Sequence, residues 1–189
     1  RLLFLDGRIT CKITDVSDGN ISFIVISGCG TIKTGNSLVF PDSIISYIPI
    51  LQDDLKLLKK LEKQGTPVDW VLLSMISTAA DVIHAKKILS HELNKMPAIM
   101  VKIEVKSAVD DIEEITKIAD GVMVARGDLG QAIPYYQLPD SEKRIIQIAK
   151  YYGKVVFVAT QALETYAKEG LPQRAELIDL ATVKWLNAD

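Results

Sequence analysis

The sequence has little cysteine, and this excludes one structural class. Only two of the 189 residues are cysteine, Cys11 and Cys29. Two cysteines cannot form a disulfide framework, and a pair with no nearby histidine is a poor metal site. We therefore expect both to be small buried hydrophobic residues of a protein in a reducing compartment, the cytoplasm.

An excess of either charge and long hydrophobic runs are also lacking. The 22 Lys and Arg residues nearly balance 24 Asp and Glu residues, and no basic block exceeds a lysine pair. This distribution argues against nucleic acid or an anionic membrane as partner. The longest apolar runs, such as Trp70–Leu73 and Val155–Ala159, have strand length and are far shorter than the roughly 18 residues of a membrane span. Because the chain begins at Arg1 and Leu2–Leu5 is too short for a signal peptide, we expect it to begin inside a longer gene product.

The pattern changes character near Pro41. Before it, the segments Arg8–Val16 and Asn20–Ile26 have strand patterns and are separated by the turn residues Ser17-Asp18-Gly19-Asn20. Pro41–Pro49 has the composition of a connecting segment. We predict a small β-rich domain at 1–40 and a second domain at 41–189.

After Pro49, helical and strand periods alternate. Strands are predicted at Trp70–Leu73, from Ala98, at Gly121–Val124 and at Val155–Val158. Helices are predicted at Asp53–Gln64, at Ala79–Leu89, from Ser107, from Asp140 or Ser141 to Gly153, at Gln161–Lys168 and at Arg174–Leu186. Short apolar strands separated by helices are typical of βαβ units in a parallel sheet. The predicted class is α/β.

Ligands of such folds bind beyond the carboxyl ends of the strands. One strand ends in Val101-Lys102-Ile103-Glu104. Because side chains alternate along a strand, Lys102 and Glu104 are predicted on the same face. By themselves they could form an ordinary exposed ion pair.

Two further strand ends carry candidate residues. After the strand at Gly121–Val124, Gly127 and Gly130 permit a positive φ, which would leave backbone amide groups free for an anion. Asp128 in the same segment offers oxygen ligands to a cation. Taken alone this is a turn, and an integrin-type Arg-Gly-Asp interpretation is weak because the tripeptide follows a buried strand. After the strand at Val155–Val158, Thr160 could merely cap the following helix.

Together these strand ends predict a site for a divalent metal and an anionic oxygen substrate. Magnesium or manganese suits the carboxylates, since no Cys/His set for zinc is present. His84 and His91 lie within or just after a helix and are interpreted as surface or core residues.

Four motifs carry a family resemblance that extends over the whole chain. In order they are Val101–Glu104, Ile118–Gly130, Ala159–Glu164 and Pro172–Glu176. Their sequence and spacing resemble pyruvate kinase, and Leu5–Ile9 resembles the exit of that family's β-rich B domain. The resemblance implies a TIM-barrel portion, the middle of a parallel (β/α)₈ barrel, preceded by a small β-rich lid remnant.

The resemblance also implies an activity and its ions. The reaction would be the glycolytic transfer of phosphate from phosphoenolpyruvate to ADP, giving pyruvate and ATP. Glu104 and Asp128 would hold Mg²⁺ or Mn²⁺, and Lys102 would stabilise the phosphoryl group in flight. The family's K⁺ ligands would lie outside this chain, and the family suggests a homotetramer.

The substrate and nucleotide contacts follow from the same resemblance. The substrate carboxylate would be received by backbone groups of Ala125, Arg126, Gly127 and Asp128. Thr160 would lie near the pyruvyl methyl group, where the enolate is protonated. Lys33 falls near lysines that face the nucleotide when the lid closes.

The chain departs from the family at several positions. Ala132 stands where the family usually has glutamate, and Thr34 where it often has a second lysine. Met75 replaces a usual phenylalanine and Gln173 a threonine. Barrel strands before Arg1 and after Asp189 would be absent, and an open half-barrel exposes apolar edges and faces.

Two alternatives remain beside a pyruvate kinase fragment. One is another enzyme of the phosphoenolpyruvate/pyruvate barrel group, an aldolase or decarboxylase with a metal-bound enolate, which needs the carboxylates but not Lys102. The other is a non-catalytic remnant or interaction module. The intact set of Lys102, Glu104 and Asp128 argues against drift.

Overall fold

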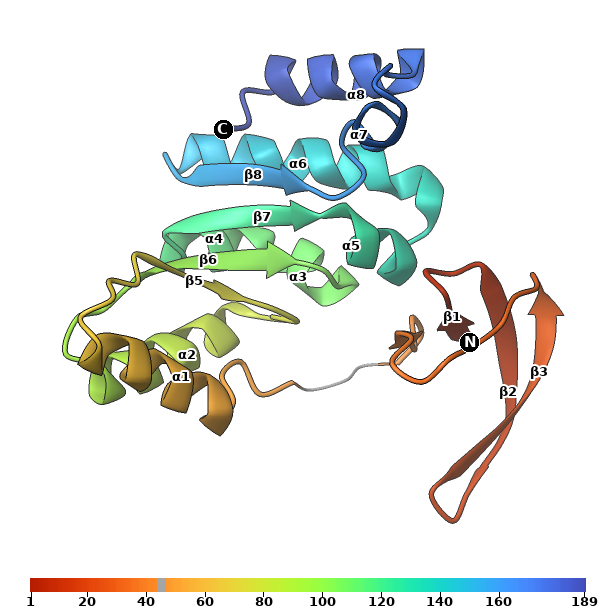
Figure 1. The fold of residues 1–189 in the computed structure, drawn as a ribbon, viewed down its shortest axis with the longest axis horizontal. Helices are drawn as coiled ribbons and strands as arrows, with labels where there is room; N and C mark the ends of the chain where they lie inside the picture. The colour runs from red at the N-terminus through yellow and green to blue at the C-terminus, as the bar shows by residue number, and fades with distance from the viewer. Residues whose placement is uncertain (44–46) are drawn as a thin grey trace.

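The computed structural model describes residues 1–43 and 47–189 and contains two separate sheets (Figure 1). One is an antiparallel sheet near the N-terminus, and the other is a parallel sheet with helices. This confirms the predicted α/β class with a β-rich N-terminal part. Residues 44–46 of the predicted connecting segment lie outside the described residues, and the division between 40 and 41 stays a prediction.

The antiparallel sheet is built around a hairpin. Its strands are β1 (Leu2–Phe4), β2 (Ile9–Ser17), β3 (Asn20–Ser27) and β4 (Leu38–Val39), in the order β3-β2-β1-β4. Asp18 and Gly19 between β2 and β3 both have positive φ, +50° and +75°. Type I′ turns require this conformation, and their twist matches that of paired strands. The predicted hairpin is therefore present, with strand ends shifted by one residue.

The two cysteines have different environments. Cys11 is fully buried and packs with Leu2 and Ile9 in the small core of this sheet. Cys29 is exposed, so the prediction that both cysteines are buried was wrong for this residue. It lies between β3 and β4, apart from the small core that Leu2, Ile9 and Cys11 form.

The parallel sheet places the candidate site. Its strands are β5 (Trp70–Leu73), β6 (Ala98–Ile103), β7 (Gly121–Ala125) and β8 (Val155–Ala159), in the order β5-β6-β7-β8. Strands that follow one another in the sequence are thus also adjacent in the sheet, which is the arrangement that repeated βαβ units produce. Lys102 pairs with Met123, and Ala125 pairs with Ala159. The carboxyl ends of β6, β7 and β8 therefore lie at one edge of the sheet.

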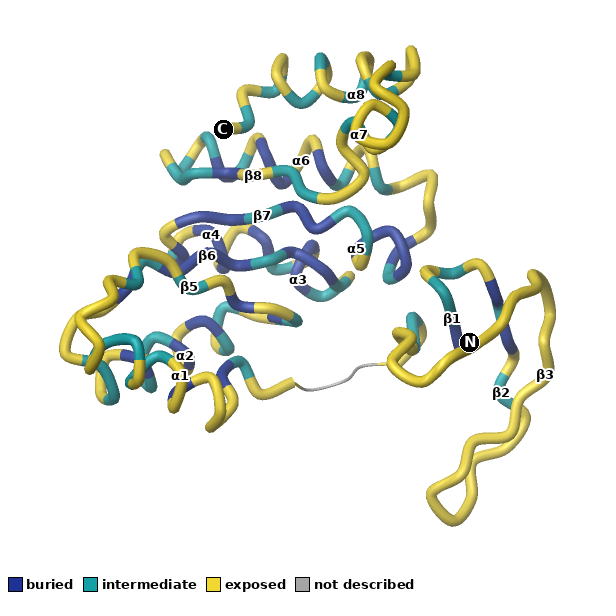
Figure 2. Tube along the Cα trace, in the orientation of Figure 1, coloured by how far each residue is buried: buried dark blue, intermediate teal, exposed yellow. Residues whose placement is uncertain are grey.

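Helices accompany the parallel strands. They are α1 (Gln52–Lys63), α2 (Ala79–Glu92), α3 (Lys106–Asp110), α4 (Ile112–Ile118), α5 (Arg126–Ala132), the 3₁₀ turn η1 (Tyr135–Gln137), α6 (Leu138–Tyr151), α7 (Glu164–Glu169) and α8 (Arg174–Trp185). Burial concentrates on β6, β7 and the helices against them, whereas α7, α8 and β3 are mostly exposed (Figure 2). The core comes from branched aliphatic residues such as Ile103, Ile112 and Ile146. Within the described part of the chain, no helix has the length and apolarity to cross a bilayer.

Two predicted helices differ from the structure. The helix predicted from Ser107 is divided into α3 and α4 at Asp111, whose carboxylate accepts the backbone N–H of Ala79 at 2.8 Å. Asp111 thus caps the start of α2. The periodicity of apolar residues along the chain cannot indicate this interaction, because the two residues are 32 positions apart. The helix predicted from Gln161 begins only at Glu164, because Thr160, Gln161 and Leu163 all have positive φ.

Apolar side chains are exposed on both outer strands of the parallel sheet. Trp70 and Leu72 on β5 and Phe157 on β8 are each 40% exposed or more. They alternate with more buried neighbours such as Leu73 and Val156. This pattern agrees with the expectation that an open part of a barrel leaves one sheet face uncovered.

Candidate active site

The Lys102–Glu104 pair lies at the carboxyl end of β6. The Lys102 ammonium forms an ion pair with Glu104 Oε1, and Lys102 Nζ also donates to Ser74 Oγ at 3.3 Å. The second oxygen of Glu104 accepts the backbone N–H of Met75 at 2.6 Å. Glu104 is 2% exposed, whereas the Lys102 side chain is 26% exposed. A buried carboxylate is thus fixed on both oxygens beside an accessible cation.

Met75 directs its backbone amide at this carboxylate from an uncommon conformation. Its φ is +56°, in the left-handed region that residues with a side chain rarely adopt. Such a conformation costs about 1–3 kcal/mol and persists only where neighbouring contacts hold it. The charge-assisted hydrogen bond to Glu104 is one such contact.

The segment after β7 is a helix rather than the glycine turn that we predicted. Residues 126–132 form α5, and neither Gly127 nor Gly130 has a positive φ. The prediction of a positive-φ amide nest was therefore wrong. Amide groups in the first turn of a helix have no partner within it, so the segment still offers donors. Asp128 is exposed in that first turn.

Thr160 follows β8 and contacts α5. Its hydroxyl oxygen accepts the backbone N–H of Gly127 at 2.9 Å. Thr160 does not cap the next helix, which was one interpretation of its position, because α7 begins after Leu163 and the Thr160 hydroxyl instead caps an amide of α5. The structure thus brings the ends of β7 and β8 into direct contact.

Other candidates lie apart from these strand ends. Lys33 is exposed in the segment between β3 and β4, and its backbone N–H donates to Asn36 Oδ1 at 2.7 Å. His84 and His91 are exposed on α2. Nothing in these contacts tests the role of Lys33 toward a nucleotide, which stays a prediction.

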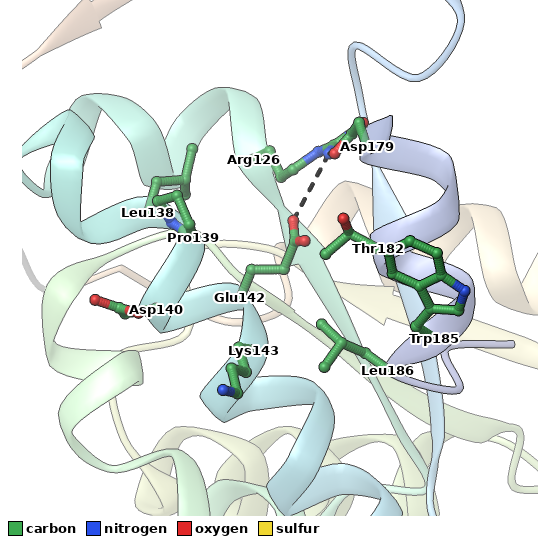
Figure 3. A pocket seen from close by; sticks show the side chains of 10 residues that line it. All are labelled: Arg126, Leu138, Pro139, Asp140, Glu142, Lys143, Asp179, Thr182, Trp185 and Leu186. Atoms are coloured by element: carbon green, nitrogen blue, oxygen red, sulfur yellow. Dashed lines mark hydrogen bonds and ion pairs between the residues drawn. The ribbon is translucent and has the colours of Figure 1, made fainter. Parts of the chain in front are cut away.

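The side chains that surround Arg126 were not predicted from the sequence. Its guanidinium Nη1 donates to both carboxylate oxygens of Asp179, at 2.6 and 2.8 Å, and lies 3.7 Å from Glu142 Oε2. Figure 3 shows these charged groups meeting between α6 and α8, where they line a cavity of about 520 Å³. Asp179 is 53 residues from Arg126, so no local pattern links them.

Glu142 occupies an uncommon position for a carboxylate. It is 7% exposed on α6 and lies among residues that cover the sheet. Burial raises the pKa of its carboxyl, Arg126 opposes that shift, and Asp179 adds to it. The sequence signal of this burial is its position on the apolar side of α6, three residues before Ile145.

The donor set at the strand ends fits a hard divalent cation. Among residues 1–43 and 47–189, no three His, Cys, Asp or Glu side chains gather into a metal site. Magnesium commonly uses one or two protein carboxylates and takes its other ligands from water and substrate oxygens. Glu104 and Asp128 would supply this small number of oxygen ligands.

A buried side chain of α5 has an unsatisfied oxygen. Gln131 Nε2 donates to the carbonyl of Gly127 at 3.2 Å, but Gln131 Oε1 has no hydrogen-bond partner among the residues that the structure describes. We expect Gln131→Met, which keeps the chain length, to raise the free energy of unfolding by about 1 kcal/mol because it removes this desolvated acceptor. Urea unfolding checks the prediction, with Gln147→Met on exposed α6 surface as the matched control. Loss of stability in Gln131→Met alone would show that its hydrogen bond outweighs the unpaired oxygen.

Comparison with known proteins identifies the family. The family model described as pyruvate kinase, barrel domain, matches residues 1–186. A pyruvate kinase of Agrobacterium vitis is 37% identical over 188 residues, covering 100% of this chain and 38% of the relative. That of Thermotoga maritima is 36% identical over 190 residues, covering 100% and 40%, and that of Clostridium perfringens is 37% identical over 180 residues, covering 95% and 37%. The chain spans about two fifths of the length of these curated relatives. It belongs to the pyruvate kinase family.

Proposed function

We propose that this chain contributes the phosphoryl-transfer site of a pyruvate kinase, which moves phosphate from phosphoenolpyruvate to ADP and yields pyruvate and ATP. The observation that carries the proposal is the Lys102–Glu104 pair, where an accessible ammonium group lies beside a buried carboxylate at the carboxyl end of a barrel strand. Catalytic groups of barrel enzymes occupy this end. The family match over the whole chain supports the assignment.

Lys102 is the proposed electrostatic catalyst. Phosphoryl transfer spreads negative charge over the oxygens of the transferred group, and a fixed cation nearby stabilises that charge. Glu104 and Ser74 hold the Lys102 ammonium in place, while its partial exposure leaves a side open to substrate. The cation is therefore oriented before the substrate binds, so little reorganisation accompanies the reaction.

The backbone at the start of α5 is the proposed receptor for the substrate carboxylate. The segment comprises Ala125, Arg126, Gly127 and Asp128, and first-turn amides of a helix favour an anion. The amide of Gly127 already donates to the hydroxyl of Thr160. A carboxylate that uses this amide would displace or share the hydroxyl, which brings Thr160 close to the rest of the substrate. Thr160 is then placed to deliver or accept a proton at the pyruvyl methyl carbon.

Glu104 and Asp128 would hold Mg²⁺ or Mn²⁺. Such an ion, when bound, neutralises negative charge on phosphate and enolate oxygens. The two side chains differ in a useful way, because Glu104 is buried and fixed whereas Asp128 is exposed and free to adjust. We further propose that Lys33 faces the nucleotide, that K⁺ takes its ligands from outside this chain, and that the complete enzyme is a homotetramer.

Calorimetric titration with oxalate, a mimic of the enolate of pyruvate, tests the site. We expect oxalate to bind the chain in the presence of Mn²⁺ and to bind at least about 10-fold more weakly without the metal. Asp128→Ala should remove the metal-dependent part, because it deletes an exposed oxygen ligand without disturbing the core.

Asp140→Ala, which removes a carboxylate elsewhere on the surface, should bind like the unmodified chain. Circular dichroism establishes that each variant is folded. A folded, unmodified chain that shows no metal-dependent binding would contradict the proposed site.

A further inference from the structure

The side chain of Arg126 clamps the backbone of Thr160. Its Nη2 and Nε atoms donate to the carbonyl oxygen of Thr160, at 2.7 and 3.2 Å. The other edge of the same guanidinium binds Asp179, and the side chain of Arg126 is only 10% exposed. One planar group therefore joins the end of β8 to α8 from its own place at the start of α5.

The backbone that Arg126 holds is the kind that requires support. Thr160 has a φ of +73°, and Gln161 follows with +54°. A β-branched residue in the left-handed region is a genuine outlier, because its branched side chain crowds the backbone. Conformations of this type persist where surrounding contacts over-determine them, and they gather at functional sites.

The strained conformation has a defined result at the candidate site. It directs the Thr160 hydroxyl to the Gly127 amide, at 2.9 Å, instead of toward α7, the helix that follows Thr160 in the chain. The fit is close, since a Cβ added to Gly127 would lie 3.4 Å from the Thr160 hydroxyl oxygen. The residue whose carbonyl Arg126 binds is thus the same residue whose hydroxyl contacts α5.

Two carboxylates keep Arg126 in this position. Asp179 binds it with two hydrogen bonds from α8, and Glu142 lies 3.7 Å away on α6, as Figure 3 shows. The planar five-donor fork of arginine can bind a carboxylate and a carbonyl at the same time, whereas the single ammonium of lysine cannot reproduce both contacts. Compensation by two carboxylates also explains how a guanidinium remains in this largely buried place.

We propose that the Arg126 side chain, braced by Asp179 and Glu142, is a positioning residue that acts through Thr160. It holds the Thr160 hydroxyl at the end of β8, in the orientation needed for proton transfer at the substrate methyl carbon. This consequence for catalysis rests on the proposed function of Thr160. The role is separate from that of the Arg126 backbone toward the substrate carboxylate.

The test compares Arg126→Met and Arg126→Lys with Arg144→Met, which makes the same change at an exposed position of α6. The first readout is the side-chain angle χ1 of Thr160, measured from NMR couplings, because this angle sets the direction of the hydroxyl. The second is exchange of pyruvate methyl protons with deuterium from D₂O in the presence of Mn²⁺, in which a C–H bond breaks and a C–D bond forms. The third is the dissociation constant for oxalate with Mn²⁺.

Both Arg126 variants should change the χ1 angle of Thr160 and slow methyl exchange by about 10- to 100-fold, while the oxalate dissociation constant changes far less. Arg144→Met should change none of the three. In a Thr160→Val background, Arg126→Met should add little further loss of exchange, because both changes disable the same group. A merely structural role would weaken oxalate binding and exchange together, or give additive losses.

Different results would contradict the role of Arg126 and the proposed function of the chain. An unchanged χ1 angle of Thr160 in folded Arg126→Met overturns the proposal, whatever the catalytic readouts give. Unchanged methyl exchange in both Arg126 variants also overturns it. If the unmodified chain neither binds oxalate nor exchanges methyl protons, the proposed function fails, and the χ1 angle of Thr160 alone then decides whether Arg126 positions Thr160.

Discussion

Lys102→Met is expected to lower phosphoryl transfer from phosphoenolpyruvate to ADP by about 10²- to 10³-fold. The substitution removes the ammonium that stabilises charge on the transferred group, and loss of one such fixed donor costs this much in other enzymes. The straight apolar chain of methionine keeps most of the volume. Oxalate binding with Mn²⁺ should survive, because Glu104, Asp128 and the amides of α5 remain. The loss should therefore appear in kcat rather than in binding.

Pyruvate formation, coupled to NADH oxidation, measures this effect in the chain with its barrel completed by the matching segments of a relative. Glu104 is buried and loses its cation in this variant, so unfolding by urea is measured beside activity. Lys106→Met, an exposed lysine of α3, is the matched control. Full activity of a folded Lys102→Met protein would contradict the proposed role of the ammonium. Equal loss in Lys106→Met would show that the assay reports general damage.

Ile146→Ala is expected to lower the free energy of unfolding by about 2–5 kcal/mol. Ile146 is fully buried on α6 and belongs to the main core. Truncation loses the transfer free energy of the deleted carbons and leaves a cavity that packed neighbours fill only partly. Since the total stability of a domain is about 5–15 kcal/mol, one such change is a large part of it.

Urea unfolding followed by circular dichroism measures the effect. Ile83→Ala on α2 makes the same chemical change at a side chain that is 55% exposed, and it should stay within about 0.5 kcal/mol of the unmodified chain. Similar losses in both variants would mean that Ile146 does not lie in a well-packed core. A smaller loss for Ile146 alone would mean that α6 can collapse onto the sheet.

Most of the parallel sheet could be predicted because its signals are local. Trp70–Leu73 was predicted with its observed bounds, and β7 and β8 each differ by one residue at one end. Continuous apolar runs between polar helices are enough to mark buried strands. The pairing of Lys102 with Glu104 follows equally directly, because alternation along a strand puts residues two apart on one face.

The segments that follow the strands were harder to predict. The glycines of Arg126–Ala132 suggested a turn, but the segment is helical and packs its buried Leu129 into the core. Helix α7 starts late because Thr160 and its neighbours adopt positive φ, which a β-branched residue does not favour by itself. Intrinsic preferences were overridden at these places by contacts from distant segments.

The sequence by itself determined the α/β class, the strands of the parallel sheet, the face shared by Lys102 and Glu104, and the family resemblance. These depend on short-range periodicity and on ordered motifs within one stretch of chain. Only the tertiary structure decided that Arg126 binds Asp179 and the carbonyl of Thr160, because those contacts join residues 34 and 53 positions apart. A buried cation must find its compensating carboxylates wherever the packed helices bring them, and no local rule states where that is.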